Sequence, residues 1–451
     1  MNKGSLSVLF CTLLLVLNNN AVSGPAEEFI IDDEFDFFDN IEQQPSTKNN
    51  DIKPSQNKQL FVKGYLKQKQ SYSIHNRSKP RKPDKSAGES QRRTVIDVTA
   101  EGELKEQIYY RINANVSLDK YNEVDDDFEW REVYLNLETV DNLWLKFGRQ
   151  IISWGESNYT QILDQANPRD NREIGLVDAE DARLPVWATK LSHVGDRWGT
   201  DLVLIHEFRA NKDAEIDDDF DRFITFRNNY QIEDAIDPDV SFSNPEVILR
   251  LFLSLPKGDV SLIYAKVFND TSTLREGDVV NQLEPYYAQM EVFGLSGNWI
   301  NDQWLYKFEL AQKHKVPVQN TIKLGTPTDK VISQFMMGAE YALNVDTDFE
   351  FEWVAQRIEA YNDSLKPAQT QISTVSKLSF DMWHDTAQFV VSWGHMIQAN
   401  SDIVRVSFDY DYTDNIKLGG GYLNYHADND RARLFSYQDD DRLYFSVRYS
   451  F

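Results

Sequence analysis

The chain has 451 residues, a formal net charge of −25 and 13% aromatic residues. The acidic excess argues against a nucleic-acid partner, because a polyanion would be repelled. The aromatic content excludes a disordered acidic protein, since such chains are poor in aromatic side chains.

The first residues have the pattern of a secretory signal peptide. A single lysine precedes an apolar run from Leu6 to Leu17, and Ala21 and Ser23 are small residues at the positions that a signal peptidase reads. The run is too short to span a bilayer as a helix. We therefore expect residues 1–23 to be a signal peptide that is removed after export.

Cysteine and histidine usage limits the chemistry of the mature chain. Cys11, the only cysteine, lies within the signal peptide, so no disulfide is expected. The 7 histidines show no paired metal-ligand spacing, and we expect no metal and no cofactor. After Leu17 no apolar run is long enough for a transmembrane helix. The remaining classes are a soluble exported protein and an outer-membrane β-barrel.

Residues 24–57 differ from the rest of the chain in composition. An acidic and aromatic stretch from Glu27 to Phe38 is followed by polar residues with Pro45 and Pro54. We predict a disordered acidic and polar tail in the periplasm. The alternative is a short motif that enters the pore or docks on a periplasmic partner.

From residue 58 onward, apolar and polar residues alternate with period two. Val404, Val406 and Phe408, for example, alternate with Arg405 and Ser407. This pattern predicts strands with one apolar and one polar face. A soluble β-sandwich would show the same alternation.

Strand length and connection length favour the barrel over the sandwich. Many predicted strands have about ten residues, which suits a tilted bilayer span. The connections also alternate between short and long, as expected when the two rims face different compartments. We predict a transmembrane antiparallel β-barrel over residues 58–451, with about eighteen strands. Sixteen strands is the second choice, and the location is the outer membrane of a Gram-negative cell.

The strand pattern can be written as two alternating sets. Strands of one direction are expected near 60–74, 104–117, 142–151, 197–209, 258–269, 302–314, 347–359, 385–398 and 414–426. Strands of the other direction are expected near 92–101, 128–138, 186–194, 246–256, 284–297, 331–343, 370–382, 402–411 and 442–451. The even number depends on a predicted turn at Glu101 and Gly102.

The carboxyl terminus has the pattern of a closing barrel strand. Phe445, Val447, Tyr449 and the terminal Phe451 alternate with more polar residues. An aromatic last residue in such a strand resembles the signal by which the outer-membrane barrel assembly machinery recognises its clients. That machinery is therefore an expected partner.

The phase of the strands predicts which side chains face the lumen. A charged side chain that faces lipid at mid-depth costs roughly 2–4 kcal/mol for Arg or Lys, so charges should point inward. They either select the solute or brace the wall through salt bridges. The expected lumen-lining residues are Glu132, Gln150, Arg250, Gln289, Glu291, Lys307, Glu309, Glu350, Glu352, Gln388, Arg405, Asp409 and Arg448.

Residues 152–185 are too many for a plain connection between strands. They carry charges of both signs, and Pro168 and Pro185 stiffen them. We predict a loop that folds into the barrel and narrows the pore; the alternatives are a plug and a loop packed on the surface. The expected pore-constriction or binding residues are Glu156, Asn167, Arg169, Asp170, Arg172, Glu173, Asp181 and Arg183.

The same region carries a resemblance to a known family. The quoted segments are Gly148-Arg149-Gln150, Ser153-Trp154-Gly155-Glu156-Ser157, Asn167-Pro168-Arg169-Asp170 and Asp181-Ala182-Arg183-Leu184-Pro185. They resemble the signature of a poorly characterised family of proteobacterial outer-membrane barrels, known mainly as a domain of unknown function. The resemblance implies a porin-like or exporter-like channel, in a family often associated with inner-membrane exporters of lipidic cargo. It implies no catalytic residues.

The sequence thus predicts a non-enzymatic channel, or the outer-membrane component of an export or uptake route. Its cargo is a solute or a lipidic molecule. A non-conducting structural or surface-binding barrel plugged by residues 152–185 is the main alternative. A lipid hydrolase using His395 and Ser392 is a remote one. Basic residues between 75 and 91 favour contact with membrane lipids and lipopolysaccharide. An inner-membrane exporter or a periplasmic protein is a further expected partner.

Overall fold

The computed structural model describes most of the chain beyond the amino terminus. The described residues are 60–74, 88–105, 107–120, 127–175, 182–214, 220–223, 227, 229–240, 244–320, 323–428, 434, 437–438 and 440–451. The predicted signal peptide, the predicted tail and most of the basic segment lie outside these residues. No helix in the described part is long and apolar enough to cross a membrane.

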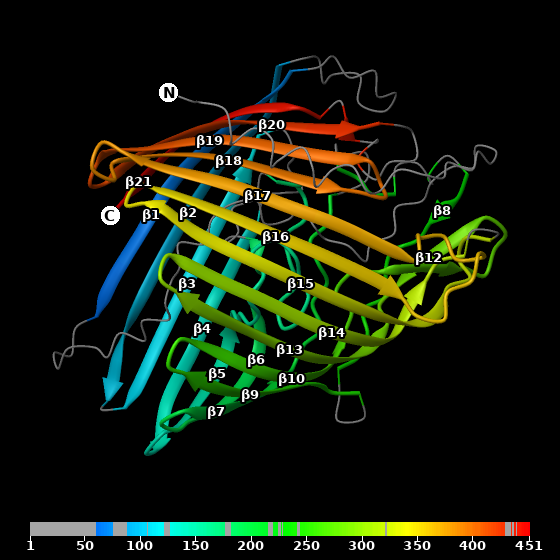
Figure 1. The fold of residues 1–451 in the computed structure, drawn as a ribbon, viewed down its shortest axis with the longest axis horizontal. Coiled ribbons are helices and arrows are strands. Elements are labelled where there is room, and N and C mark those ends of the chain that lie inside the picture. The colour runs from blue at the N-terminus through cyan, green and yellow to red at the C-terminus, as the bar shows by residue number, and fades with distance from the viewer. Residues whose placement is uncertain are drawn as a thin grey trace, which may run out of the picture.

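Eighteen antiparallel strands form one closed sheet (Figure 1). Each strand pairs with the next barrel strand in the chain, and β21 pairs with β1 to close the ring. The strands are β1 (Phe61–Ser73), β2 (Gly88–Lys105), β3 (Ile108–Asp119), β4 (Asp127–Val140), β5 (Leu143–Gln150), β6 (Val186–Val194), β7 (Trp198–Ile205), β9 (Glu246–Leu255), β10 (Gly258–Phe268), β13 (Gln289–Asn301), β14 (Trp304–Val318), β15 (Thr328–Asn344), β16 (Thr347–Ile358), β17 (Thr370–Met382), β18 (Ala387–Met396), β19 (Ser401–Thr413), β20 (Ile416–Ala427) and β21 (Arg442–Ser450).

Three short strands form a separate small sheet. They are β8 (Gln231–Ile232), β11 (Thr273–Glu276) and β12 (Gln282–Tyr286). They belong to the long connections, and Figure 1 shows β8 and β12 beside one end of the barrel. We call this end the long-loop rim and the opposite end, with its short hairpin turns, the short-turn rim.

The predicted all-β barrel and its eighteen strands are confirmed, and the sixteen-strand alternative is wrong. The predicted turn at Gly102 is also wrong. Gly102 lies within β2 and pairs with Tyr110 of β3. The hairpin turn lies between Lys105 and Ile108, where Gln107, five residues after Gly102, has a φ of 69°. This turn needs one residue with a positive φ, and Gln107 adopts that left-handed backbone conformation although glycine is the usual choice.

The expected strand near 284–297 is correct only in part. Residues up to Tyr286 belong to β12, and the barrel strand β13 begins at Gln289. Pro285 lies in β12, the middle strand of the small sheet, where it is paired with Leu274 of β11 and is not part of the barrel wall. Proline lacks the amide hydrogen that a central barrel strand needs, which explains why the wall begins after it.

The last residue takes part in closing the barrel. Phe451 N donates to Gly64 O at 2.9 Å, and Gly64 N donates to Phe451 O at 2.9 Å. The Phe451 side chain is 54% exposed on the outer surface. Because an open sheet edge would leave unpaired amides in lipid, this closing pair satisfies the main requirement of a membrane barrel.

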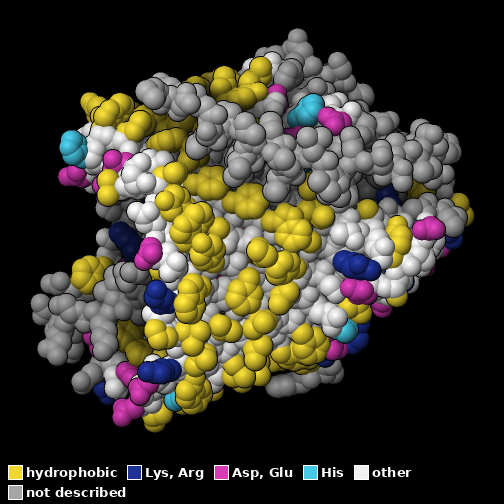
Figure 2. Space-filling view, viewed as in Figure 1, with side chains coloured by type: hydrophobic (Ala, Val, Ile, Leu, Met, Phe, Trp, Pro, Cys, Tyr) yellow, Lys and Arg dark blue, Asp and Glu magenta, His cyan; other side chains and the backbone are white. Residues whose placement is uncertain are grey.

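The outer face of the barrel is apolar. Figure 2 shows hydrophobic side chains spread over the wall that faces the viewer, with charged side chains gathered toward its ends. Leu310, Phe351 and Trp393 are among the large hydrophobic residues exposed on this face. Their neighbours along each strand point inward, since successive strand residues alternate between faces.

Replacing Gly148 with alanine is predicted to destabilise the barrel. Gly148 has a φ of +130°, and a Cβ there would collide with the backbone carbonyl of Val133. We expect Gly148→Ala to cost roughly 1–3 kcal/mol, measured as a lower urea midpoint of tryptophan fluorescence in lipid vesicles. Gly338→Ala is the matched control, because the backbone of Gly338 lies outside the left-handed region and its nearest neighbour is Glu352 Cγ at 3.3 Å. Equal midpoints for the two variants would contradict the prediction.

Candidate functional site: the loop that crosses the barrel

The segment between β5 and β6 leaves the wall and returns to it at one buried asparagine. Ile152 N donates to Asn167 Oδ1 at 2.7 Å, and Asn167 Nδ2 donates to Leu184 O at 2.6 Å. Asn167 is fully buried. Its side-chain amide thus joins the outgoing and the returning chain through two hydrogen bonds. We call residues 152–175 and 182–185 the crossing loop.

Ion pairs hold the returning part of the crossing loop to its middle. Arg183 Nε lies 2.9 Å from Asp164 Oδ2, and Arg169 lies 3.6 Å from the same oxygen. Arg172 pairs with Asp170 two residues away. These side chains are largely buried, so each charge depends on its partner for compensation.

The first end of the crossing loop rests on carboxylates of the barrel wall. Glu309 of β14 accepts hydrogen bonds from the backbone amides of Glu156 and Ser157, the latter at 2.8 Å. Glu352 of β16 accepts one from Asn158 N at 2.9 Å and one from Ser157 Oγ at 2.7 Å. Three of these four contacts use backbone amides as donors, which the side-chain pattern of the loop does not reveal.

The same wall carries more acidic than basic groups. Glu350 accepts from Tyr159 Oη at 2.8 Å and lies 3.5 Å from Lys377. Lys307 pairs with Glu340 and lies 3.7 Å from Glu350. We call the set Lys307, Glu309, Glu340, Glu350, Glu352 and Lys377 the acidic wall. Four carboxylates face two ammonium groups there, and amides and hydroxyls of the loop supply further donors.

Apolar packing supports the same contact. Ile162 and Leu163 are buried against the wall. Gly294 of β13 faces Leu163 so closely that a Cβ would collide with the leucine side chain. The glycine therefore allows the loop to lie directly on the strand.

The second end of the described loop reaches a different part of the ring. Arg93 of β2 lies 3.0 Å from Glu173, and Arg405 Nη1 of β19 donates to Gly175 O at 2.8 Å. Tyr425 of β20 donates through its hydroxyl to Ile174 O. We call these contacts the far anchor.

The crossing loop therefore passes through the barrel interior. It begins and ends at β5 and β6, and its contacts fall on β13–β16 and on β19, β20 and β2. These groups of strands lie in separate parts of the closed ring. One short segment can reach all of them only across the lumen.

Three carboxyl groups of the crossing loop have shifted pKa values. Burial raises the pKa of Glu156, and the hydrogen bond from Asn298 and the nearby Lys307 and Arg250 offset this only in part. Burial also raises the pKa of Asp170 and of Glu173, but their arginine neighbours outweigh it. The pKa of each is net lowered, mainly by Arg172 for Asp170 and by Arg93 for Glu173.

The predicted constriction residues have two different placements. Glu156 and Glu173 contact the wall, through Asn298 and Arg93 respectively. The other described residues of the set bond mainly within the crossing loop or to the residues beside it. They are Asn167, Arg169, Asp170, Arg172 and Arg183. Asp181 lies outside the described residues.

Strand phase places most of the predicted lumen residues on the inner face. The inner-face residues are Glu132, Gln150, Arg250, Lys307, Glu309, Glu350, Glu352, Gln388, Arg405, Asp409 and Arg448. Gln289 and Glu291 lie on the outer face with Phe293, so this part of the prediction is wrong. Glu291 pairs with Lys315 at 2.6 Å near the long-loop rim. A charge this close to the rim is solvated and need not turn inward.

The wall-contacting tip of the loop was missed by the sequence reasoning. Ser157, Asn158 and Tyr159 carry no charge, whereas all but one of the predicted constriction residues are charged. A usable signal lies instead in β16, where Glu350 and Glu352 are successive inward carboxylates. Two buried acids in one strand require donors from another part of the chain.

The structure separates the residues of the hydrolase alternative. Ser392 is buried on the inner face of β18, whereas His395, three residues later, lies on the outer face. His395 Nδ1 lies 2.8 Å from Asp402 Oδ1. No group of three or more potential metal ligands occurs among the described residues.

A charge-neutral variant of the far anchor should reveal a pH-dependent contribution to stability. Because the pKa of Glu173 is lowered in the folded chain, its contribution is complete above the ordinary carboxyl range and is lost as the pH falls. Glu173→Gln should cost roughly 1–3 kcal/mol at neutral pH, measured from urea midpoints, and much less in acid.

The control for this variant is Asp411→Asn. Asp411 pairs with Lys417 at 3.4 Å, but the two side chains are nearly half exposed, so little loss is expected. A Glu173→Gln effect that stays constant as the pH falls would contradict the assigned role.

Comparisons with known proteins agree with this architecture. A family model described as "Protein of unknown function (DUF1302)" matches residues 46–212, a range that includes the crossing loop. No curated protein matches the chain. Among solved structures, OccK11 (OpdR) of Pseudomonas aeruginosa is 9% identical with a TM-score of 0.50, over 87% of this chain and 95% of that one.

Two Acinetobacter baumannii proteins are also similar. OccAB4 is 10% identical with a TM-score of 0.49, over 88% of this chain and 99% of that one. The outer membrane channel DcaP is 8% identical with a TM-score of 0.44, over 87% and 97%. At such identities the likeness concerns the fold alone, and for this chain that fold is a closed antiparallel barrel of eighteen strands.

Proposed function

We propose that the protein is a passive channel in the outer membrane of a Gram-negative cell, with the crossing loop as its constriction. The observation that carries the proposal is a closed barrel with an apolar outer face and a charged inner face, crossed by a loop fixed to two parts of the wall. Passage through such a channel needs only pore width, lining charge and a constriction.

A polar solute suits this lumen better than a lipidic one. The inner face carries Arg250, Arg405 and the acidic wall, and the crossing loop adds further charges of both signs. Desolvating these groups along an apolar cargo would be costly. A role in export, together with an inner-membrane exporter, remains the second form of the same proposal.

The proposed location rests on the outer surface of the closed barrel. An apolar band covers the outer wall, and β21, which closes the ring against β1, adds Phe445, Val447 and Tyr449 to it. The amino-terminal pattern of a signal peptide is consistent with export. Lipopolysaccharide and membrane lipids would then contact the outer face.

A non-conducting, plugged barrel is the second candidate. Glu309, Glu352 and Arg405 are no more than 2% exposed although they lie on the inner face. Such burial shows how tightly the loop fills its surroundings at these points. A plug would give the barrel a structural or surface-binding role instead of conduction.

Removing the crossing loop distinguishes a constriction from a plug. If the loop is a constriction, the wild type conducts in planar bilayers, and replacing residues 158–180 with a short Gly-Ser linker should raise single-channel conductance at least about twofold. A silent wild type and a conducting variant would instead establish the plug. No current from either protein would overturn the channel proposal.

Neutralising one exposed carboxylate of the acidic wall should change ion selectivity. Glu340 is about one-third exposed, so ions in the lumen can approach it. Glu340→Gln is expected to lower the ratio of potassium to chloride permeability roughly twofold, measured from the reversal potential in a salt gradient. Glu291→Gln is the matched control, because Glu291 lies on the outer face and should leave this ratio unchanged. Equal shifts in both variants would contradict the proposed lining.

A further inference from the structure

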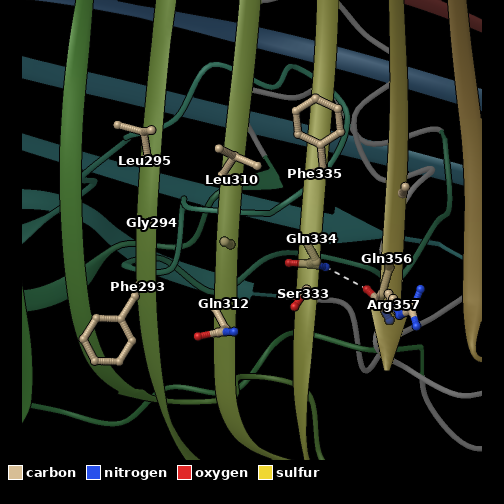
Figure 3. Close-up of a pocket in the computed structure, with 12 residues that line it drawn as sticks. Phe293, Gly294, Leu295, Leu310, Gln312, Ser333, Gln334, Phe335, Gln356 and Arg357 are labelled. Carbon is tan, nitrogen blue, oxygen red and sulfur yellow. Dashed lines mark hydrogen bonds between the residues drawn. The ribbon is translucent and has the colours of Figure 1, made fainter. Parts of the chain in front are cut away.

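Two glutamines face each other on the inner wall of the barrel, near the long-loop rim. Gln334 of β15 and Gln356 of β16 are paired in register, and Gln334 Nε2 donates to Gln356 Oε1 at 2.7 Å. Figure 3 shows this hydrogen bond between the two strands. Both side chains are at least 96% buried.

Their hydrogen bond leaves one acceptor and one donor unused. Among the described residues, no partner is found for Gln334 Oε1 or for Gln356 Nε2. If both side-chain amides were rotated by 180°, Gln356 would donate and Gln334 would accept. One amide oxygen and one amide nitrogen would again have no hydrogen-bond partner. The pair therefore presents a neighbouring donor and acceptor whichever way the amides point, and leaving them unsatisfied would be costly.

The pair lines a small hollow between the wall and the crossing loop. Its volume is about 50 Å³, and Thr160 of the loop lines it from the opposite side. Thr160 Oγ1 is likewise buried and has no partner among the described residues. Since one water-sized group needs roughly 10–15 Å³ of such space, the hollow admits about three to five of them.

The remaining lining is mostly polar and nearly neutral, with Met290, Val316 and Ile332 as its apolar members. Gln161, Gln165, Asn211 and Thr271 contribute amides and a hydroxyl. Asp270 and Lys313 add one charge of each sign, and both have other partners. A lining of this kind offers hydrogen bonds without a net charge, so it favours neutral ligands over ions.

The wall has a second hollow of about 550 Å³, which Phe293, Leu310 and Phe335 line on the outer face and whose lining also includes Gln334 and Gln356 (Figure 3). On the inner face, the neighbours of the two glutamines along each strand are buried and apolar: Ile332 and Met336 in β15, and Val354 and Ile358 in β16. A buried amide pair is expensive there unless something in the lumen binds it.

We infer that Gln334, Gln356 and Thr160 form a subsite that binds the hydroxyl-bearing edge of a neutral solute, such as a sugar or polyol. The inference deepens the proposed channel function and rests on it, since the solute would bind during passage. Each hydroxyl both donates and accepts, which matches the donor and acceptor of the pair. The subsite lies on the long-loop side of the loop tip that touches the acidic wall.

Glucose binding to the full-length protein in detergent tests the subsite without requiring conduction. Saturation-transfer NMR should detect glucose binding to the wild type. The double variant with Gln334→Met and Gln356→Met should bind glucose about tenfold more weakly. Methionine keeps the length of the side chain and removes both amides, so the wall should still pack. Gln312→Met is the matched control, because Gln312 lies on the outer face and bonds to His314.

A second variant separates binding from wall folding. Thr160→Val changes only the loop and should weaken glucose binding severalfold, while heat-modifiable gel migration reports that the barrel is intact. Unchanged affinity in both variants, or binding of acetate but not glucose by the wild type, would overturn the subsite. Glucose binding that is lost in the variants of a non-conducting protein would support the subsite and overturn the channel. A protein that conducts but does not bind glucose would support the channel and overturn the subsite.

Discussion

A carboxylate buried in a barrel wall must find hydrogen-bond donors, and this requirement organises the interior. Glu309 and Glu352 find theirs in the backbone amides of Glu156, Ser157 and Asn158. The wall thus lacks enough hydrogen-bond donors for its buried carboxylates, and the loop tip lacks acceptors for its backbone amides. Each therefore completes the other, which explains why the loop lies across the lumen rather than on the rim.

Much of the architecture could be predicted because a membrane barrel repeats one local rule. Alternation of apolar and polar residues specifies the faces of each strand, as in Val404 to Phe408, and the connection lengths specify the rims. The rule fails where its physical cause is absent. Gly102 offers glycine's conformational freedom inside a continuous strand, and Glu291 lies close enough to the rim for water to solvate it.

The interior of the lumen could be predicted only in part. Length and charge indicated an inward loop, and Glu156 and Glu173 do reach the wall. The contacts at Ser157 and Asn158 depend on backbone amides, which every residue except proline possesses, so composition does not mark them. The glutamine pair is similar, since neither Gln334 nor Gln356 differs in sequence from an ordinary polar residue of a strand. Only the register of β15 and β16 brings them together.

The pairing of Phe451 with Gly64 has a consequence for the order of assembly. The ring is complete only when the final strand meets the first, and the two are separated by almost the whole chain. The crossing loop touches β2 and β19, which lie on either side of that seam. Closing the seam and docking the loop both bring together residues that are far apart in the sequence, which is costly in chain entropy. If the seam closed before the crossing loop had docked, the loop would have to enter the lumen through the opening at one rim of the barrel.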